Sequence, residues 1–376
     1  MPIAITGTGL FTPPFSISNE ELVTSFNAWV AADNAQHHDA IARGERKALE
    51  PSSADFIVKA SGIERRYAME REGILDPAIM APRITERPNE QHSIQCEMSI
   101  AAAKEAMAQA RITPDRIGAV IVACSNHQRA YPAIAVEVQE ALGIKGFAFD
   151  MNVACSSATF GINVANDLVT AGTVKAVLVV SPEICTGHLN FRDRESHFIF
   201  GDACTAVVVE DTSTTSAPVA WEILGTRLAT KFSNNIRNNA GFLNRTAPDH
   251  RDDTDKLFVQ QGRKVFKDVS PMVADLIAGH LDSVGIAPGA IRRMWLHQAN
   301  ATMNQWIGRK VLGRDATREE APSILEEYAN TSSCGSIITF HKHREGFADG
   351  EVGVICSFGA GYSIGSVIVK KQTRDA

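Results

Sequence analysis

The sequence predicts an α/β protein built from two duplicated halves that meet face to face. Short apolar runs of strand length alternate with segments whose apolar residues recur at helical spacing, and one helix–turn–strand pattern occurs twice. The composition agrees, because 44% of the 376 residues are hydrophobic and only 21% are charged. That is enough apolar material for a large core in one domain or in two fused halves.

The first 92 residues are expected to hold one strand, two helices and a surface loop. Residues 2–10 form the strand, and Ser18 caps a helix with Glu21 at the capping-box position. Residues 31–51 are polar and helix-prone, and residues 55–66 are compact, with a turn at Ser61-Gly62. Residues 73–91 are rich in proline and turn formers, which is typical of a loop.

The repeated pattern begins with an Ala-rich helix at residues 93–110, which leads into a strand at residues 117–124. A second helix at residues 272–284 leads into a strand at residues 291–296 in the same register. The register pairs Pro114 with Pro288, Ile117 with Ile291, Val122 with Leu296 and Asn126 with Asn300, and after a one-residue slip Cys155 with Asn330. We therefore predict halves at residues 1–212 and 213–376, divided at the Ser/Thr-rich stretch 211–217.

Cys155 lies where an extended segment, residues 146–153, gives way to a helix, residues 156–171, that stops at Gly172. The helix carries apolar residues at helical spacing, namely Phe160, Val164 and Leu168. Unpaired backbone N–H groups and the helix dipole at such a position lower a thiol pKa and can hold an oxyanion. Taken alone, a buried structural cysteine is the commoner explanation.

Two further polar residues and a glycine-rich turn follow apolar strands. His297 follows the strand at 291–296, Asn330 lies in YANTSS, and the strand at 352–356 runs into Ser357–Tyr362. Ligands bind beyond the carboxyl ends of strands in open α/β sheets, so one shared site is expected. A cysteine with a histidine and an asparagine elsewhere in the chain is a candidate nucleophile.

Charge and cysteine usage exclude several classes of protein. The net charge of −6 gives no support for a nucleic-acid partner. The seven cysteines are odd in number and contain no CxxC pair, which indicates a reducing compartment and neither a disulfide framework nor a zinc site. The N-terminus lacks a basic signal region and the longest apolar runs have strand length, so a cytoplasmic protein without membrane insertion is expected.

Five motifs together resemble the β-ketoacyl-ACP synthase III family of the thiolase superfamily. They occur in the family's order over nearly the whole chain: NVACSS around Cys155, FGDA at Gly201-Asp202, HQAN at His297, YANTSS at Asn330, and SFGAGYSIGS. The resemblance implies a thiolase-like fold in five layers, αβαβα. A biosynthetic thiolase would place a second catalytic cysteine directly before the closing turn, whereas Cys356 lies earlier in a strand.

The resemblance also implies a mechanism without a cofactor or a metal, in which acyl-CoA and malonyl-ACP are substrates. Cys155 would attack the acyl-CoA thioester, and malonyl-ACP would lose CO₂ to form the attacking enolate. His297 and Asn330 would donate hydrogen bonds to the malonyl thioester oxygen. The amides of Cys155 and Ala360 would hold the oxyanion of the condensation step.

Substrate contacts are carried over from the family position by position. Phe56 and Arg194 match the pair that sandwiches the CoA adenine, although the family commonly has tryptophan at the first position and a basic residue where Ala60 stands. Lys267, Arg309 and Lys310 match basic positions that meet the carrier protein, whereas Thr302 replaces an expected arginine. For each of these charges alone, a solvated helix face is the alternative.

Chain length and assembly also rest on the resemblance. Two insertions, within residues 31–51 and 73–91, make the chain look most like the medium-chain branch, which primes with octanoyl-CoA and makes β-ketodecanoyl-ACP. Tyr131 takes the place of an aromatic residue that crosses a homodimer interface into the partner's acyl pocket. Two alternatives remain. One is a condensing enzyme for a secondary metabolite, such as an alkylquinolone or a polyketide starter, and the other is a non-catalytic partner subunit.

Overall fold

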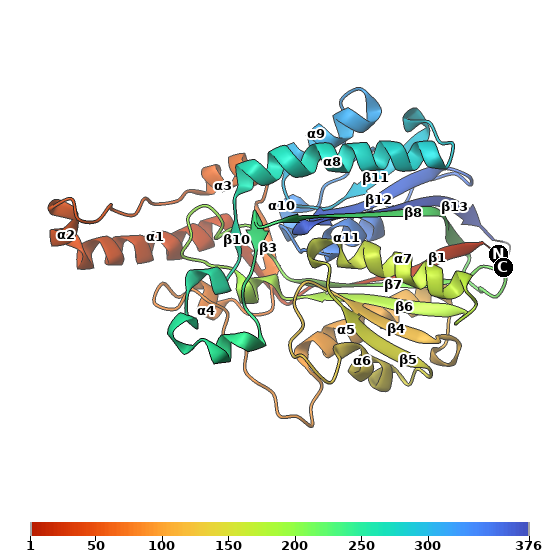
Figure 1. The fold of residues 1–376 in the computed structure, drawn as a ribbon, viewed down its shortest axis with the longest axis horizontal. Helices are drawn as coiled ribbons and strands as arrows, with labels where there is room; N and C mark the ends of the chain where they lie inside the picture. Colours follow the sequence, from red (N-terminus) through yellow and green to blue (C-terminus); the bar gives the residue numbers. More distant parts are fainter. Residues whose placement is uncertain (1, 375–376) are drawn as a thin grey trace.

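One nine-stranded sheet, bent into two halves with helices outside and between them, forms the framework of the molecule (Figure 1). The computed structural model describes residues 2–374. The strand order is β11-β12-β13-β8-β1-β7-β6-β4-β5. Within the sheet, the pairing of β1 with β8 connects the two halves, through Ala4 with Glu222 and Ile5 with Trp221.

The two halves of the sheet repeat one pattern of pairing. In the N-terminal half β4 is parallel to β6, β6 is antiparallel to β7, and β7 is antiparallel to β1. In the C-terminal half the same sequence of pairings joins β11, β12, β13 and β8. The strands are β1 Ile3–Phe11, β4 Ala119–Ala123, β5 Phe147–Met151, β6 Ala176–Glu183, β7 Ala203–Asp211, β8 Val219–Ser233, β11 Ile291–Leu296, β12 Val352–Gly359 and β13 Gly361–Thr373.

Helices cover the sheet in three layers, which Figure 1 shows with α8 and α9 at one side, α7 and α11 in the middle, and α5 and α6 at the other. These helices are α5 Ile94–Ala110, α6 Ile134–Leu142, α7 Ser157–Thr170, α8 Gly262–Ser283, α9 Ala301–Leu312 and α11 Cys334–Lys342. Separate apolar clusters fill the space under each layer. The order of layers is therefore αβαβα, and the predicted fold class is confirmed, as are two duplicated α/β halves.

The remaining elements lie around one end of this framework. A long arm formed by α1 and α2 projects away from the body (Figure 1). These elements are α1 Asn19–Gln36, α2 His38–Ala42, α3 Ala54–Ser61, α4 Glu72–Leu75, α10 Leu325–Tyr328, and the short strands β2 Phe15–Ser18, β3 Arg65–Ala68, β9 Ile236–Arg237 and β10 Val259–Gln260. Seven short 3₁₀ turns complete the described chain: Pro114–Arg116, Ala154–Ser156, Cys185–His188, Phe242–Thr246, Pro248–His250, Thr254–Lys256 and Pro288–Ala290.

Several local predictions are confirmed by the cap geometry. The Ser18–Glu21 capping box is present at the start of α1. Gly62 ends α3 with a φ of 86°, and Gly172 follows α7 with a φ of 73°. These left-handed conformations suit glycine, which has no Cβ to strain.

Other boundaries differ from the prediction. The polar segment 31–51 is helical only to residue 42, and its remainder runs back along α1 through bonds such as Asn34 Nδ2 to the Leu49 carbonyl at 3.0 Å. Helix α8 begins ten residues before the expected start at residue 272. The surface loop 73–91 contains part of the one-turn helix α4.

The apolar residues whose spacing predicted α7 do not form its buried face. Phe160, Val164 and Leu168 are only partly buried, and the fully buried positions on the same helix are mostly small. Because α7 packs against both halves of the sheet, it has little room on its buried side. A Cβ added at Gly161 would lie 2.8 Å from the Val179 side chain.

The Ser/Thr-rich stretch 211–217 lies between two strands of the sheet. Strand β7 ends at Asp211 and β8 begins at Val219, on either side of the Ser/Thr-rich stretch. The division into residues 1–212 and 213–376 stays a proposal, because hydrogen bonds between β1 and β8 make the sheet continuous. Among residues 2–374, none of the helices has the length and apolar character needed to cross a bilayer.

Candidate active site

A cavity of about 300 Å³ lies between the two halves, and Cys155, His297 and Asn330 all line it. Its walls are otherwise largely apolar. They include Phe198, Phe200, Ile236, Phe258, Val265, Phe266, Val269, Met303 and Phe358. The three residues that the sequence singled out are therefore brought together, with an apolar space beside them that suits an acyl chain.

Cys155 sits in the 3₁₀ turn between β5 and α7, directly after a residue with a left-handed backbone. Ala154 has a φ of 47°, and its amide donates to Asn152 Oδ1 at 2.8 Å. The Ser157 hydroxyl accepts from the Val153 amide at 2.8 Å. These bonds hold a conformation that costs a non-glycine residue about 1–3 kcal/mol, as is common at functional sites.

Asn330 repeats this arrangement in the other half. Ala329, the residue before it, has a φ of 56°, just as Ala154 does before Cys155. The Asn330 side-chain oxygen accepts from the Ser332 amide at 2.9 Å. Because Oδ1 is engaged in this bond, the Nδ2 group is the part of Asn330 that remains to donate to a ligand.

His297 follows β11 and is held as a neutral imidazole. Its side chain is only 2% exposed and packs edge-on against Phe358, with ring centroids 5.2 Å apart. Burial lowers the pKa of His297 to about 4, and the nearby Ser332 carbonyl opposes only part of this shift. Nδ1 makes no hydrogen bond of normal geometry within residues 2–374.

The thiol of Cys155 differs from the expectation for a helix N-terminus. Burial raises its pKa to about 11, against the opposing effect of a hydrogen bond from Ser332 Oγ at 3.5 Å. The charge of Glu183 raises the pKa further, whereas the amides of Ala360 and of Cys155 itself lower it. Desolvation therefore outweighs the backbone dipoles, and the resting cysteine is a thiol.

The closing turn is built for close approach to the sulfur. A Cβ at Gly359 would lie 2.6 Å from the Cys155 Cβ and 2.9 Å from its Sγ, so only glycine fits there. Gly361 has a φ of 129°, a conformation that side chains rarely adopt. Ala360, between these glycines, presents its amide toward Cys155, as an oxyanion donor would.

Phe56 and Arg194, the expected adenine clamp, contact each other at the wall of the cavity that Phe56 forms. The Arg194 guanidinium carbon lies 4.5 Å from the centroid of the Phe56 ring, and Nε donates to the Pro51 carbonyl at 2.9 Å. Phe56 lines the cavity, while Arg194 borders a separate groove under the inserted segment 47–50. A flat ring between them would need a gap of about 7 Å, two van der Waals contacts, so the pair must open to admit one.

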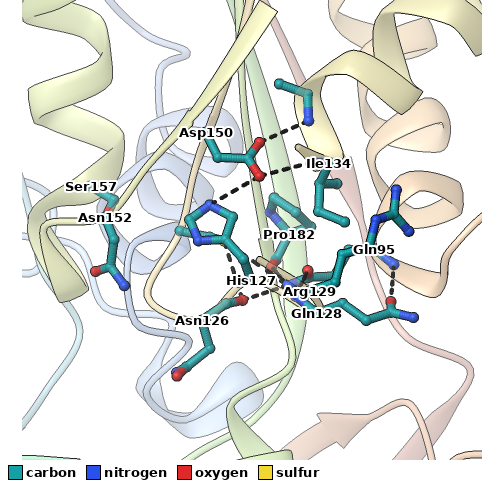
Figure 2. A network of polar contacts seen from close by, with 12 residues as sticks. Gln95, Asn126, His127, Gln128, Arg129, Ile134, Asp150, Asn152, Ser157 and Pro182 are labelled. Atoms are coloured by element: carbon teal, nitrogen blue, oxygen red, sulfur yellow. Dashed lines mark hydrogen bonds and ion pairs between the residues drawn. The ribbon is translucent and has the colours of Figure 1, made fainter. Parts of the chain in front are cut away.

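Tyr131 does not line the cavity of its own chain, and its side chain is 85% exposed. The loop that carries it is nevertheless firmly held (Figure 2). Gln95 donates to the Asn126 carbonyl at 2.6 Å and accepts from the Gln128 amide at 2.6 Å. Asp150 caps α6 just after Tyr131, by accepting from the Ile134 amide at 2.8 Å. A fixed loop with an exposed aromatic tip fits contact with a second molecule.

The three basic residues expected to meet a carrier protein are all exposed, on α8 and α9. Arg309 pairs with Asp315 at 2.5 Å, and the Lys310 ammonium lies 5.4 Å from the Trp306 ring centroid. Lys267 has no ion pair within the described chain. Sequence reasoning missed Arg263 and Lys264, exposed at the start of α8 beside the cavity-lining Gly262.

Two other parts of the site were not anticipated. Ser332, which contacts both Cys155 and Asn330, lies within the YANTSS motif but was not singled out. Phe200 and Phe258 form an aromatic wall, with ring centroids 4.7 Å apart. Phe200 belongs to the quoted segment around Gly201, whereas Phe258 lies in a segment without any pattern that could have identified it.

One group of potential metal ligands occurs within residues 2–374, away from the cavity. His92, Cys96 and Glu137 bring ligand atoms within 4.8 Å of one another. The Glu137 carboxylate already accepts from Ser93 and from Arg129 at 2.7 Å. The arginine charge beside it disfavours a cation, so we assign no metal to this group.

A duplicated αβαβα fold with a cysteine, a neutral histidine and an amide donor around one apolar cavity defines the class of thiolase-like enzymes. The model of 3-oxoacyl-[acyl-carrier-protein] synthase III matches residues 149–231, and the model of its C-terminal part matches residues 281–371. The chain is 60% identical over 348 residues to the beta-ketodecanoyl-[acyl-carrier-protein] synthase of Pseudomonas aeruginosa, covering 93% of this chain and 99% of that one. It is 30% identical to the beta-ketoacyl-[acyl-carrier-protein] synthase III of Actinobacillus succinogenes, covering 85% and 91%.

Solved structures agree on the fold. The 3-oxoacyl-[acyl-carrier-protein] synthase III of Aquifex aeolicus superposes with a TM-score of 0.75 at 23% identity, over 98% of this chain and 99% of that one. The priming β-ketosynthase of the R1128 polyketide pathway also gives 0.75, at 22% identity over 98% and 96%. The chain belongs to the 3-oxoacyl-[acyl-carrier-protein] synthase III family of condensing acyltransferases.

Acidification should destabilise the fold through buried histidines. Burial lowers the pKa of His188, His197, His280 and His297 to about 4 from an ordinary value of 6.5. Between these values the unfolded chain binds protons that the folded chain does not, so the free energy of unfolding falls as the pH drops. Asp202, whose pKa burial raises to about 6, and Glu183, whose pKa burial also raises, act oppositely but are two groups against four histidines. Urea titrations at pH 7.0, 5.5 and 4.5 should show a falling midpoint, and a rising one would contradict this assignment.

Proposed function

We propose that this protein condenses a medium-chain acyl-CoA, about octanoyl, with malonyl-ACP to give 3-oxoacyl-ACP, initiating fatty acid synthesis. The observation that carries the proposal is the convergence of Cys155, His297 and Asn330 on one apolar cavity. The medium-chain substrate is supported by the 60% identity to a relative named for β-ketodecanoyl-ACP.

In the first half-reaction Cys155 Sγ forms a bond to the acyl-CoA carbonyl carbon. The tetrahedral oxyanion lies between the amides of Cys155 and Ala360, and its collapse breaks the bond to the CoA sulfur. Because burial raises the pKa of Cys155 to about 11, the thiol proton has to leave as the bond forms, and the departing CoA thiolate accepts it. An exposed thiolate is not needed before the substrate arrives.

In the second half-reaction malonyl-ACP loses CO₂, and the electron pair of the broken bond forms an enolate. Asn330 Nδ2 and the neutral His297 ring donate hydrogen bonds to the enolate oxygen. The enolate carbon then bonds to the acyl carbonyl carbon and releases the Cys155 thiolate, which takes up a proton from solvent to restore the resting thiol. Neither donor has to remove a proton from carbon, which agrees with a histidine whose pKa burial lowers to about 4.

The acyl-enzyme provides the direct test of this function. After incubation with octanoyl-CoA, intact-protein mass should show one octanoyl adduct on the wild type and none on Cys155→Ala. Subsequent addition of malonyl-ACP should discharge the adduct as 3-oxodecanoyl-ACP. Absence of an adduct with any acyl-CoA would indicate a non-catalytic subunit, whereas an adduct that malonyl-ACP does not discharge would indicate a synthase for another acceptor.

His297→Ala and Asn330→Ala should separate the two half-reactions. Both variants should keep most of the Cys155 self-acylation but slow malonyl decarboxylation by about 10²-fold or more, the usual cost of losing one oxyanion donor. The measurement is acyl-adduct formation by mass alongside release of CO₂ from malonyl-ACP. If His297→Ala abolished the adduct, His297 would instead be the base for the thiol.

Arg194→Ala should weaken only the nucleotide end of the substrate. Loss of a stacked guanidinium should raise the KM for octanoyl-CoA by about tenfold and leave kcat unchanged, since a cation–π contact contributes ~1–2 kcal/mol. Octanoyl-pantetheine, which has no nucleotide, should be unaffected. Arg192→Ala is the matched control, because Arg192 borders the same groove as Arg194 but lies over Trp29 and not over the cavity-lining Phe56. Equal losses with both substrates would place Arg194 outside the CoA site.

We also propose a homodimer formed along β5. This strand is an edge of the sheet, and Phe147, Tyr131 and Val136 are exposed apolar side chains on or beside it. An unpaired edge flanked by apolar side chains is a favourable surface for pairing with a second copy. Because Tyr131 is exposed and does not line the cavity of its own chain, it lines an acyl pocket only if a partner supplies that pocket.

The carrier protein is proposed to dock on α8 and α9 beside the mouth of the cavity. Lys267, Arg309 and Lys310 are exposed there, together with Arg263 and Lys264 at the start of α8. An acidic carrier would be attracted by this surface at long range, so its association should weaken as salt rises.

Chain-length preference should depend on Tyr131 acting across the dimer. The kcat/KM for saturated acyl-CoAs of two to fourteen carbons should peak near eight carbons. Acetyl-CoA has six fewer methylenes to bury than octanoyl-CoA, so it loses ~5 kcal/mol of gross binding free energy. Tyr131→Ala should move the peak to longer chains and Tyr131→Trp to shorter ones, because a packed wall resists extra methylenes by ~1–3 kcal/mol. An acetyl-CoA optimum in the wild type would exclude the medium-chain assignment.

A mixed dimer provides the control for that prediction. In a dimer of one Cys155→Ala chain and one Tyr131→Ala chain, the single active cysteine faces the unaltered Tyr131 of its partner. The octanoyl optimum should therefore return. A peak that stays at longer chains would mean that Tyr131 acts within its own chain.

A further inference from the structure

Glu183, the last residue of β6, is a buried acid with no role in the reaction described above. It is 1% exposed and accepts hydrogen bonds from two serines. Ser125 donates its amide at 3.0 Å and its hydroxyl at 2.5 Å, and Ser333 donates its amide at 3.2 Å and its hydroxyl at 2.5 Å. Every partner is a donor, which is the pattern of an ionised carboxylate.

The two serines belong to different halves of the molecule. Ser125 follows β4 in the N-terminal half, and Ser333 directly precedes α11 in the C-terminal half. Ser333 directly follows Ser332, which donates its hydroxyl to Cys155 and its amide to Asn330. Glu183 thus connects, through hydrogen bonds, the loop that carries Asn330 to the ends of β4 and β6.

Burying this carboxylate lowers the free energy of unfolding, so stability alone does not explain it. Within residues 2–374, no basic side chain forms an ion pair with Glu183. Burial raises its pKa, and only the serine hydrogen bonds oppose that rise. A buried charge without a counter-ion disfavours folding relative to an apolar residue of similar size. An unpaired acid beside an active cysteine is more readily explained by function.

The titratable groups that the Glu183 charge acts on are cysteines. Burial raises the pKa of five thiols and the Glu183 charge raises each further: Cys124, Cys155, Cys185, Cys204 and Cys334. Cys185 also donates its thiol to Glu183 Oε2 at 3.9 Å. The charge of Glu183 therefore acts on a nucleophile that it does not touch.

We propose that Glu183 is a positioning residue, whose carboxylate holds the Asn330–Ser333 loop in register with Cys155 and whose negative charge disfavours the Cys155 thiolate in addition to burial. The inference rests on the proposed function for its first part, the placement of Asn330 as a donor to malonyl-ACP. Its second part, the charge acting on the thiol, requires no substrate.

Two substitutions at Glu183 separate the effect of side-chain length from the effect of charge. Glu183→Asp keeps the charge but is one methylene shorter. Iodoacetamide at pH 8 should therefore alkylate Cys155 in this variant as fast as in the wild type. Decarboxylation of malonyl-ACP should be about tenfold or more slower, because the shorter side chain misplaces the loop that carries Asn330. Glu183→Gln keeps the length but loses the charge. Cys155 in this variant should be alkylated about tenfold faster at pH 8, which corresponds to a fall of roughly one unit in the Cys155 pKa. Decarboxylation should also be slow, because the glutamine amide cannot accept hydrogen bonds from both serine hydroxyls.

Glu210→Gln is the matched control. Glu210 is a buried carboxylate at the opposite end of the β6–β7 pair, since Glu183 lies opposite Ala203 and Glu210 lies opposite Ala176. Loss of this charge should lower stability without changing either rate. Ser333→Ala serves as a second test if a Glu183 variant fails to fold, because it removes one tether and should slow decarboxylation while alkylation stays at the wild-type rate.

The outcomes decide between a positioning role and a structural one. A merely structural Glu183 would lower the melting temperature of the variants and leave both rates unchanged, which would overturn the inference. Wild-type decarboxylation in Glu183→Asp or in Ser333→Ala would overturn the positioning part, and an unchanged alkylation rate in Glu183→Gln would overturn the charge part. If the wild type itself failed to use malonyl-ACP, the proposed function would fail, and the alkylation rates would still decide whether Glu183 acts on Cys155.

Discussion

The structure depends on burying two helices, α7 and α11, between the halves of one bent sheet. Both helices contact strands on each side, and seven of the nine residues of α11 are buried. Small residues make this possible, as at Gly161 and at Gly335, where an added Cβ would lie 3.1 Å from the Gln298 amide. Because each central helix begins at the same end of its half, the residues just before them, Cys155 and Asn330, face one cavity.

The duplication therefore has a chemical consequence as well as an architectural one. The same backbone device, an alanine with positive φ, precedes Cys155 in one half and Asn330 in the other. One copy presents a thiol to the cavity and the other a side-chain amide. The strain of both turns is held by hydrogen bonds, and Glu183 joins the two sides through Ser125 and Ser333. Chemistry has diverged at these positions while the local geometry has been kept.

Desolvation dominates the electrostatics of the site. It leaves Cys155 protonated and His297 neutral, although the backbone amides near the sulfur act in the opposite direction. Both states suit a condensation in which the carbanion is generated by loss of CO₂ and the thiol proton leaves with CoA. The same apolar walls that perturb these groups, such as Phe358 and Phe200, form the space for an acyl chain.

Sequence alone determined the elements, the repeat, and the three residues that converge on the cavity. Helix caps such as Ser18 and strand runs such as 291–296 are encoded locally, and the register from Pro114 to Asn126 recurs at Pro288 to Asn300. Only the tertiary structure decided the pKa of Cys155, the buried face of α7 and the link through Glu183. Each of these depends on atoms from the other half of the chain. Local propensity and residue spacing do not predict how strongly those distant atoms desolvate a side chain.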